Sequence, residues 1–419
     1  MSYQSFDLLN KLYFVRTGGS AEELKAAEIL KAECEAIGVE AHLESFKVDG
    51  CKIEKASVKF LNPDMEIECA GVGMSSSTSA EGITGEFTYI TSQADAEIQN
   101  VEGKICLIHS KLVNQKLYKT LVEKKAIGLV LCTGSVYDEA ENVDLDPYMY
   151  RERNYKHGKI PAVCIRMKDA EKVLRARPEK VNMVLIQEEL QNDSHNVVAT
   201  IEGSKYKDQV IAITAHFDSV SYSKGAYDNA TGSTGIMQLL AYFKEHAPER
   251  TLKFIWCGSE EMGLLGSIAY CESHKEELKN YKLCVNIDMI GVTLGFDIAC
   301  CTSNVSLVNY IKYLGCEVGF PIQVRQGVYS SDSTPFADNG VPALSFARIA
   351  PQGGAVIHSR KDVMDFLEED NYYKSCDFIA SFTERLANAV VFPVEQEIPG
   401  NMKEEIEYYF GRKEREGGR

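Results

Sequence analysis

The spacing of hydrophobic and polar residues differs between three regions of the chain. Residues 20–37 show a helical period that opens with Ser20 and Glu23, a capping-box pattern. From about 51 to 187, short apolar runs alternate with polar turns, which indicates a region of short strands. After residue 190, nearly continuous apolar strands are separated by helical segments. This last pattern is typical of an α/β fold with a buried sheet.

The individual elements can be placed from the same pattern. In the region of short strands, one helix is expected at 113–125, before an apolar run at 126–132. The later region predicts three helices, at 229–246, 264–278 and 371–391. Its strands are expected at 195–203, 209–219, 251–259, 283–291 and 341–349.

Composition narrows the class of protein. The chain has 419 residues, 45% of them hydrophobic, and a net charge of -16 without a basic patch, so nucleic acid is not expected as a partner. The longest apolar runs are too short to span a bilayer, and the first residues do not resemble a signal peptide. Thirteen cysteines without a CxxC pair, several within apolar segments, indicate reduced thiols. We therefore expect a cytoplasmic protein with no membrane partner.

The first candidate for chemistry is a histidine and an aspartate at the end of a predicted strand. His216 and Asp218 are two residues apart, so an extended backbone places both on one side. Ligands of open α/β sheets gather beyond the carboxyl ends of strands. One residue could bind a metal while the other orients its ring, but the pair alone is weak evidence.

Acidic residues follow at two more predicted strand or helix ends. Asp228 precedes a predicted helix, where an N-cap is the simpler explanation, although its two oxygens could also bridge two cations. Glu260 and Glu261 follow an apolar strand between close-packed glycines. Two adjacent acids are costly to bury unless a cation offsets them, and a solvated loop is the alternative.

Two further residues complete the candidate set. Asp288 lies inside an apolar strand, where an acid without a partner is hard to explain structurally. His358, taken alone, is more typical of an ordinary hydrogen-bonded histidine. Carboxylates mixed with imidazoles suit zinc or a similar divalent ion. Five ligands exceed one tetrahedral site but suit two metals that share a carboxylate, as in several classes of hydrolase.

These motifs together resemble a known family. The segments AHFDS, YDNATGS, GSEEMGLLGS, NIDMIG and IHSRKD, in this order, are similar to co-catalytic zinc exopeptidases of the bacterial leucine aminopeptidase and glutamate carboxypeptidase type. The resemblance covers residues 190–395 and implies a three-layer α/β domain with a mixed, largely parallel sheet. Residues 51–187 resemble the β-rich protease-associated insert of many members. The resemblance thus implies a discontinuous peptidase domain of 1–50 and 188–395, with a charged tail at 396–419.

The resemblance also implies a metal-binding arrangement. In it, His216 and Asp288 hold one zinc, Glu261 and His358 hold the other, and Asp228 bridges them. Cobalt or manganese also suits such ligands. A cis peptide bond often follows the bridging aspartate of these proteins.

Other positions receive catalytic or substrate roles from the same resemblance. Glu260 would be the general base, and Asp218 would orient the first histidine. Tyr329 lies near the place of an oxyanion-stabilising tyrosine in some relatives. Ser333 stands where the family's SDHxPF segment commonly has histidine, so a role for that position is in doubt.

The expected activity is release of N-terminal amino acids from peptide substrates by a water that the metals activate. A carboxypeptidase or dipeptidase is the alternative on the same core, with Arg348 or Arg360 available to bind a substrate carboxylate. A single-zinc enzyme similar to glutaminyl cyclase and a non-catalytic scaffold are the remaining alternatives. The filled ligand positions argue against both. Oligomeric state and side-chain preference are not readable from the sequence.

Overall fold

The structure is a computed structural model that describes residues 3–92, 95–110, 113–139, 143–145 and 148–413. The chain forms two compact units. Unit 1 consists of Met1–Val48 and Asn192–Arg419, and unit 2 consists of Asp49–Gln191. The expected boundaries, 1–50 with 188–395 and 51–187, differ from these by no more than four residues at the two crossings between the units.

Unit 1 is built on a mixed, largely parallel sheet. Strands β10, β9, β11 and β14 are neighbours and parallel to one another, which positions their carboxyl ends along one edge. The sheet continues antiparallel on both sides, through β8 at one end and through β12 and β13 at the other. The strands are β8 (Lys180–Ile201), β9 (Tyr206–His216), β10 (Arg250–Cys257), β11 (Tyr281–Ile287), β12 (Phe296–Thr302), β13 (Ile322–Gln326) and β14 (Ala343–Ile349).

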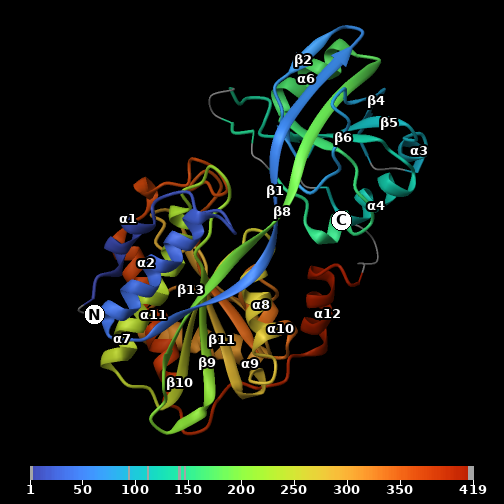
Figure 1. The fold of residues 1–419 in the computed structure, drawn as a ribbon. Coiled ribbons are helices and arrows are strands. Elements are labelled where there is room, and N and C mark those ends of the chain that lie inside the picture. Colours follow the sequence, from blue (N-terminus) through green and yellow to red (C-terminus); the bar gives the residue numbers. More distant parts are fainter. Residues whose placement is uncertain (1–2, 93–94, 111–112, 140–142, 146–147, 414–419) are drawn as a thin grey trace. The chain divides into compact units, whose positions relative to one another are not determined.

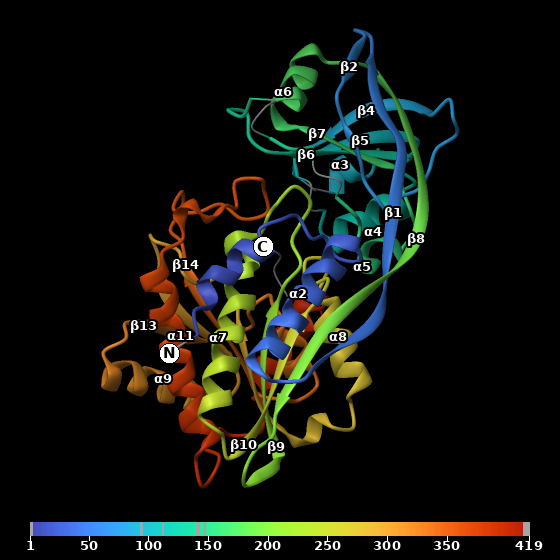
Figure 2. The ribbon, with the colours of Figure 1, turned by 60° about the vertical axis from the view of Figure 1, so that its left-hand side comes forward.

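Helices cover both faces of this sheet, so the predicted three-layer α/β fold is confirmed. Figures 1 and 2 show α2, α7 and α11 on one side of the strands. Their apolar side chains share a core with those of α9, whereas α8, α10 and α12 pack on the opposite face. The helices are α1 (Leu9–Leu12), α2 (Ala21–Ile37), α7 (Thr231–Glu245), α8 (Leu265–Ser273), α9 (Val305–Val318), α10 (Ser333–Asp338), α11 (Glu369–Ala387) and α12 (Gly400–Tyr409).

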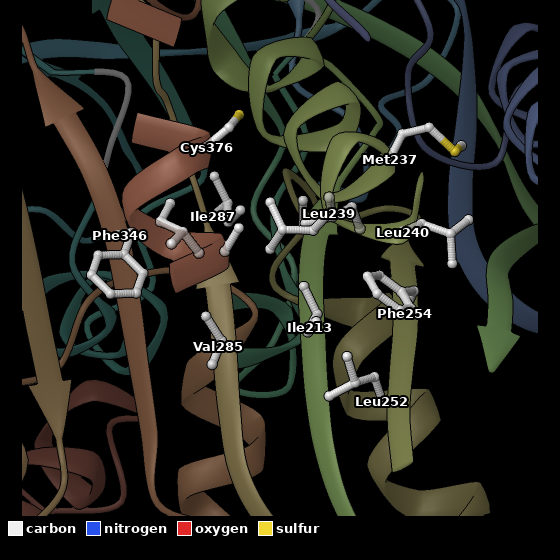
Figure 3. Close-up of a cluster of buried hydrophobic side chains, with 14 of the residues drawn as sticks. Ile213, Met237, Leu239, Leu240, Leu252, Phe254, Val285, Ile287, Phe346 and Cys376 are labelled. Carbon is white, nitrogen blue, oxygen red and sulfur yellow. The ribbon is translucent and has the colours of Figure 1, made fainter. Parts of the chain in front are cut away.

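Alternation along the strands explains the two cores. Ile211 and Ile213 of β9 face the α7 layer, while Ala212 between them faces the α8 layer. Figure 3 shows Ile213 beside Leu239 of α7 and Phe254 of β10 in the first core. Because both faces are covered, the strands read as continuous apolar runs in the sequence.

Unit 2 contains a second, smaller parallel sheet. Strands β4, β5, β6 and β7 are parallel neighbours, with β8 antiparallel to β4 and the short β3 antiparallel to β7. Helices α4 and α6 contribute to separate apolar clusters. The elements of the unit are β2 (Met65–Ile67), β3 (Ala70–Gly71), β4 (Ile83–Ile90), α3 (Asp95–Ile98), β5 (Lys104–Ile108), α4 (Gln115–Glu123), β6 (Gly128–Thr133), α5 (Glu152–Tyr155), β7 (Ala162–Arg166) and α6 (Met167–Ala176).

One expectation differs from the structure. The region of short strands was expected to begin at about residue 51, but a single long strand, β1 (Ala41–Leu61), crosses this position, and β8 is similarly long. The charged tail at 396–419, for which a peripheral helix is expected, contains α12, whose Met402 and Ile406 are buried in a core cluster of unit 1. Among the described residues, no helix combines the length and apolar character required to cross a membrane.

Candidate metal centre

The carboxyl ends of three adjacent parallel strands carry the candidate ligands. His216 is the last residue of β9 and lies in register with Cys257, the last residue of β10. Glu260 follows β10 after a short turn, and Asp288 directly follows β11. Parallel strands bring their carboxyl ends to one edge, so residues far apart in sequence meet there.

One group of ligand atoms gathers around the first histidine. His216 Nε2 lies 3.3 Å from Asp228 Oδ1 and 3.7 Å from Asp288 Oδ1. All three side chains are buried. Their ligand atoms lie within 4.8 Å of one another, which is the spacing that a shared cation requires. Burial lowers the pKa of His216, but the surrounding carboxylates, Glu260 foremost, raise it well above its ordinary value.

A second group uses the other oxygen of the same aspartate. His358 Nε2 lies 3.0 Å from Asp228 Oδ2 and 3.3 Å from Glu261 Oε2. Burial lowers the pKa of His358, yet contacts with these two carboxylates raise it to about 11. Burial raises the pKa of Asp228, but both histidines hold it below its usual range. The two oxygens of Asp228 therefore face two separate groups, as a bridging ligand does.

Two buried aspartates hold the backbone of the ligand-bearing loops. Asp218 accepts hydrogen bonds from the backbone N–H groups of Glu260 (2.9 Å) and Glu261 (3.1 Å), and it lies 3.5 Å from His216 Nδ1. Asp362 accepts from the N–H groups of Tyr227 (2.8 Å) and Asp228 (3.1 Å). Each carboxylate thus fixes two successive backbone groups beside a candidate ligand.

Glu260 lies beside the ligands and has a different environment. It is 9% exposed, and one of its oxygens groups with His216 and Glu261 within 4.8 Å. Burial raises the pKa of Glu260 well above its ordinary value, His216 opposes this rise, and Glu261 adds to it. A buried carboxylate with a raised pKa is suited to accept a proton from a neighbouring group.

The local backbone is unusual around the ligands. The Asp228–Asn229 peptide bond is cis, as the resemblance implied. Asn229 donates to Ile287 O (3.0 Å) and accepts from the N–H of Met289 (3.0 Å), which ties the bridging loop to the end of β11. Met289 and His358 have positive φ values of 67° and 54°. Residues outside the favoured backbone regions concentrate at functional sites.

The residues present fit divalent cations. Asp288 Oδ1 is buried and has no hydrogen-bond partner among the residues that the structure describes. Within the described part of the chain, neither Asp228 nor Asp288 pairs with a lysine or an arginine. Buried carboxylates need compensating charge, and two imidazoles with several carboxylates are the donor set that zinc prefers. The site thus holds more buried carboxylates than cationic side chains, and divalent cations would balance the remaining negative charge.

The two predicted substrate residues, Tyr329 and Arg348, have different surroundings. Tyr329 is mostly buried, and burial followed by the charges of Asp288 and Tyr227 raises its pKa. It therefore lies near the ligands. Arg348, however, donates to Asp297 Oδ2 at 2.6 Å and to Val292 O at 2.8 Å. The guanidinium of Arg348 thus holds β14 to β12, and its expected role in binding a substrate carboxylate stays a prediction.

Several residues of the site were not assigned from the sequence. Asp362 belongs to the IHSRKD motif but was passed over beside His358. Asp332 is fully buried, and burial raises its pKa to about 6. Ser333, the departure from the family pattern, shares a hydrogen bond of 2.8 Å with Ser345 in a buried polar network. A buried acid next to a recognised motif is the signal that could have identified the two aspartates.

Comparisons with known proteins agree with this site. Residues 196–383 match the family described as Peptidase family M28. Carboxypeptidase Q of Bos taurus is 27% identical over 395 residues, covering 88% of this chain and 81% of that protein. Aminopeptidase YwaD of Bacillus subtilis is 23% identical over 393 residues, covering 91% of this chain and 83% of that protein.

A solved structure shows the same fold. A zinc aminopeptidase from Bacillus subtilis aligns with a TM-score of 0.76 at 20% identity, over 94% of this chain and 98% of the other. The matched family region contains all five candidate ligands and Glu260.

Proposed function

Because residues 196–383 match peptidase family M28, we propose that this metallopeptidase is a dinuclear zinc exopeptidase that releases N-terminal amino acids from peptides. The observation that carries the proposal is the position of Asp228. Its Oδ1 lies 3.3 Å from His216 Nε2 and its Oδ2 lies 3.0 Å from His358 Nε2, and Asp228 belongs to both groups of ligands. The relatives include aminopeptidases and carboxypeptidases, so the choice of the amino end is the finer part of the proposal.

The proposed cation ligands fall into two groups. His216, Asp228 and Asp288 would hold one cation, and Asp228, Glu261 and His358 would hold the other. When bound, such cations polarise a scissile carbonyl and make a water molecule acidic enough to act as a nucleophile near neutral pH. The chain itself supplies the ligands and their orientation.

Proton transfer is assigned to Glu260. Its buried carboxylate takes the proton of the attacking water and passes it to the nitrogen of the leaving amine. Asp218 keeps Glu260 in place through the backbone N–H at 2.9 Å, and it lies 3.5 Å from His216 Nδ1. Tyr329 is available to donate a hydrogen bond to the developing oxyanion.

The negative charge of the site favours binding of the amino end of a peptide substrate. Seven buried or mostly buried acids surround the site, and they suit a cationic α-amine better than a carboxylate: Asp218, Asp228, Glu260, Glu261, Asp288, Asp332 and Asp362. The arginine expected to bind a substrate carboxylate, Arg348, is engaged with Asp297. Carboxypeptidase or dipeptidase action remains the second candidate, supported by the similarity to carboxypeptidase Q.

The test uses matched peptides after removal and return of metals. We expect chelation to abolish hydrolysis and zinc, cobalt or manganese to restore it, with two equivalents bound per chain. An N-acetylated peptide should resist cleavage, while its free-amine, C-amidated counterpart should be cleaved. The opposite preference would establish a carboxypeptidase, and full activity after verified metal removal would refute the proposal.

A further inference from the structure

Two charged side chains from the N-terminal segment reach the loops of the metal centre. Arg16 and Glu23 are both fully buried, and both lie outside the matched family region. Glu23 accepts hydrogen bonds from the backbone N–H (2.8 Å) and the hydroxyl (3.0 Å) of Ser259, the residue before Glu260. The segment thus contacts the site from a distant part of the sequence.

Arg16 connects this segment to the loop 217–225. Its guanidinium donates to five backbone carbonyls. Two of them belong to the first and the last residue of the loop, Phe217 and Gly225. The loop begins directly after His216 and ends three residues before Asp228. The five acceptors are Leu12, Phe14, Phe217, Lys224 and Gly225. A guanidinium is planar and rigid, so it fixes these carbonyls relative to one another.

The backbone of the same loop is held tightly. The N–H of Arg16 donates to Ser219 Oγ at 3.1 Å, and the N–H of Ser219 donates to Arg16 O at 3.2 Å. Gly225 has a φ of 51°, and a Cβ there would lie 2.4 Å from Asp228 O and 3.1 Å from Arg16 Nη2. The space between the guanidinium and the bridging aspartate is therefore filled.

The charge of Arg16 also interacts with the acids of the metal centre. Among the described residues, no carboxylate forms a direct ion pair with its guanidinium. Burial lowers the pKa of Arg16 to about 10, and Asp218, Asp362 and Asp228 oppose this from a greater distance. Arg16 is thus protonated at neutral pH, and the acids of the metal centre are its countercharges.

We propose that Arg16 is a positioning residue of the metal centre, which fixes the spacing between the strand end at His216 and the bridging Asp228. It acts through the loop 217–225 and touches neither substrate nor cation. The inference rests on the proposed metal-dependent function and extends it to a residue in another part of the chain. A displaced Asp228 would no longer present its oxygens to both groups of ligands.

The test compares Arg16→Lys with a matched control, Arg250→Lys. Arg250 is 1% exposed and donates to the carbonyls of Leu386, Ala387 and Ala389. Like Arg16, it is therefore a buried arginine that holds backbone carbonyls together. It begins β10, whereas the metal centre lies beyond the opposite end of that strand. Lysine keeps the charge in both variants but cannot reproduce the several hydrogen bonds that a guanidinium donates at once.

Three measurements separate positioning from packing. We expect both variants to lose similar thermal stability in the metal-free protein. Only Arg16→Lys should speed hydrogen exchange in residues 217–228, weaken cobalt binding by roughly 10- to 100-fold and change the visible spectrum of bound cobalt, as expected for a residue behind the ligands. The kcat for peptide hydrolysis should fall by a similar factor, with a smaller change in KM.

The proposal is overturned if Arg16→Lys matches Arg250→Lys in exchange, cobalt affinity and spectrum. Should Arg16→Lys fail to fold, Ser219→Ala removes one bond between the same segment and loop. Unchanged cobalt affinity and spectrum in that variant would equally overturn the proposal. A wild-type protein that binds cobalt but hydrolyses no peptide would refute the proposed function, while exchange and cobalt binding would still decide the role of Arg16.

Discussion

Each unit of the molecule contains a parallel sheet with helices packed against it. The two units differ in the side chains that lie at the carboxyl ends of the strands. In unit 1, β9 ends at His216, and Asp288 directly follows β11. In unit 2, β5 is followed by His109, which shares a hydrogen bond of 3.2 Å with Tyr89, and β6 by a glycine turn. Among the described residues, groups of metal-binding atoms occur only in unit 1. The carboxyl edge offers a place for a site, and the side chains decide whether one exists.

The sharpest test of this contrast is Glu260→Gln. Glutamine keeps the shape of the side chain but cannot accept the proton of a water molecule. We expect kcat to fall by roughly 10²- to 10⁴-fold, the usual contribution of a positioned base. Metal content, measured by elemental analysis, should stay at the wild-type value. A loss of less than about tenfold with both metals bound would remove Glu260 from the role of base.

A smaller effect is expected from Asp362→Asn. An amide offers one acceptor oxygen where the carboxylate accepts from both Tyr227 and Asp228, so one N–H would face an NH₂ group. We expect metal affinity, measured by competition with a chelator, to fall by about 10- to 100-fold. The matched control is Asp297→Asn, which removes a buried acid that pairs with Arg348. Equal metal affinities in the two variants would contradict the role of Asp362.

Much of the site was predictable because three of its residues lie at or just beyond the end of a strand with a clear apolar pattern. Apolar strands precede His216, Glu260 and Asp288, and the parallel arrangement then requires their ends to meet. The order of the motifs supplied Asp228 and His358. The predicted pairing of ligands agrees with the two groups that the structure brings together around Asp228.

What escaped prediction depends on contacts between distant segments. Arg16 carries no local sign of its role, because the three carbonyls that it contacts in the loop 217–225 lie about two hundred positions later. The length of strand β1, which continues through Asp49 and Gly50, was also not predicted. The ion pair of Arg348 with Asp297 was also not predicted, because its sequence neighbourhood does not reveal this partner across the sheet.

The core beneath the metal centre should affect stability and leave the chemistry nearly intact. Ile213 is fully buried between α7 and β10, three residues before His216 (Figure 3). We expect Ile213→Ala to lower the free energy of unfolding by about 2–5 kcal/mol in denaturant titrations. The kcat of the folded enzyme should stay within a few-fold of wild type. A loss of kcat beyond tenfold without a loss of stability would show that this core controls ligand geometry directly.

The smallest effect is expected at the strand ends of unit 2. His109→Ala removes the hydrogen bond to Tyr89 at an exposed position, which costs at most about 1 kcal/mol. Neither cobalt affinity nor kcat should change, because His109 lies in a sheet whose edge carries no group of ligands among the described residues. A variant with His216→Ala, its counterpart at the end of β9, should lose metal binding under the same conditions. If His109→Ala reduced metal-dependent hydrolysis as well, the carboxyl edge of unit 2 would belong to the active centre, and the contrast between the two sheets would fail.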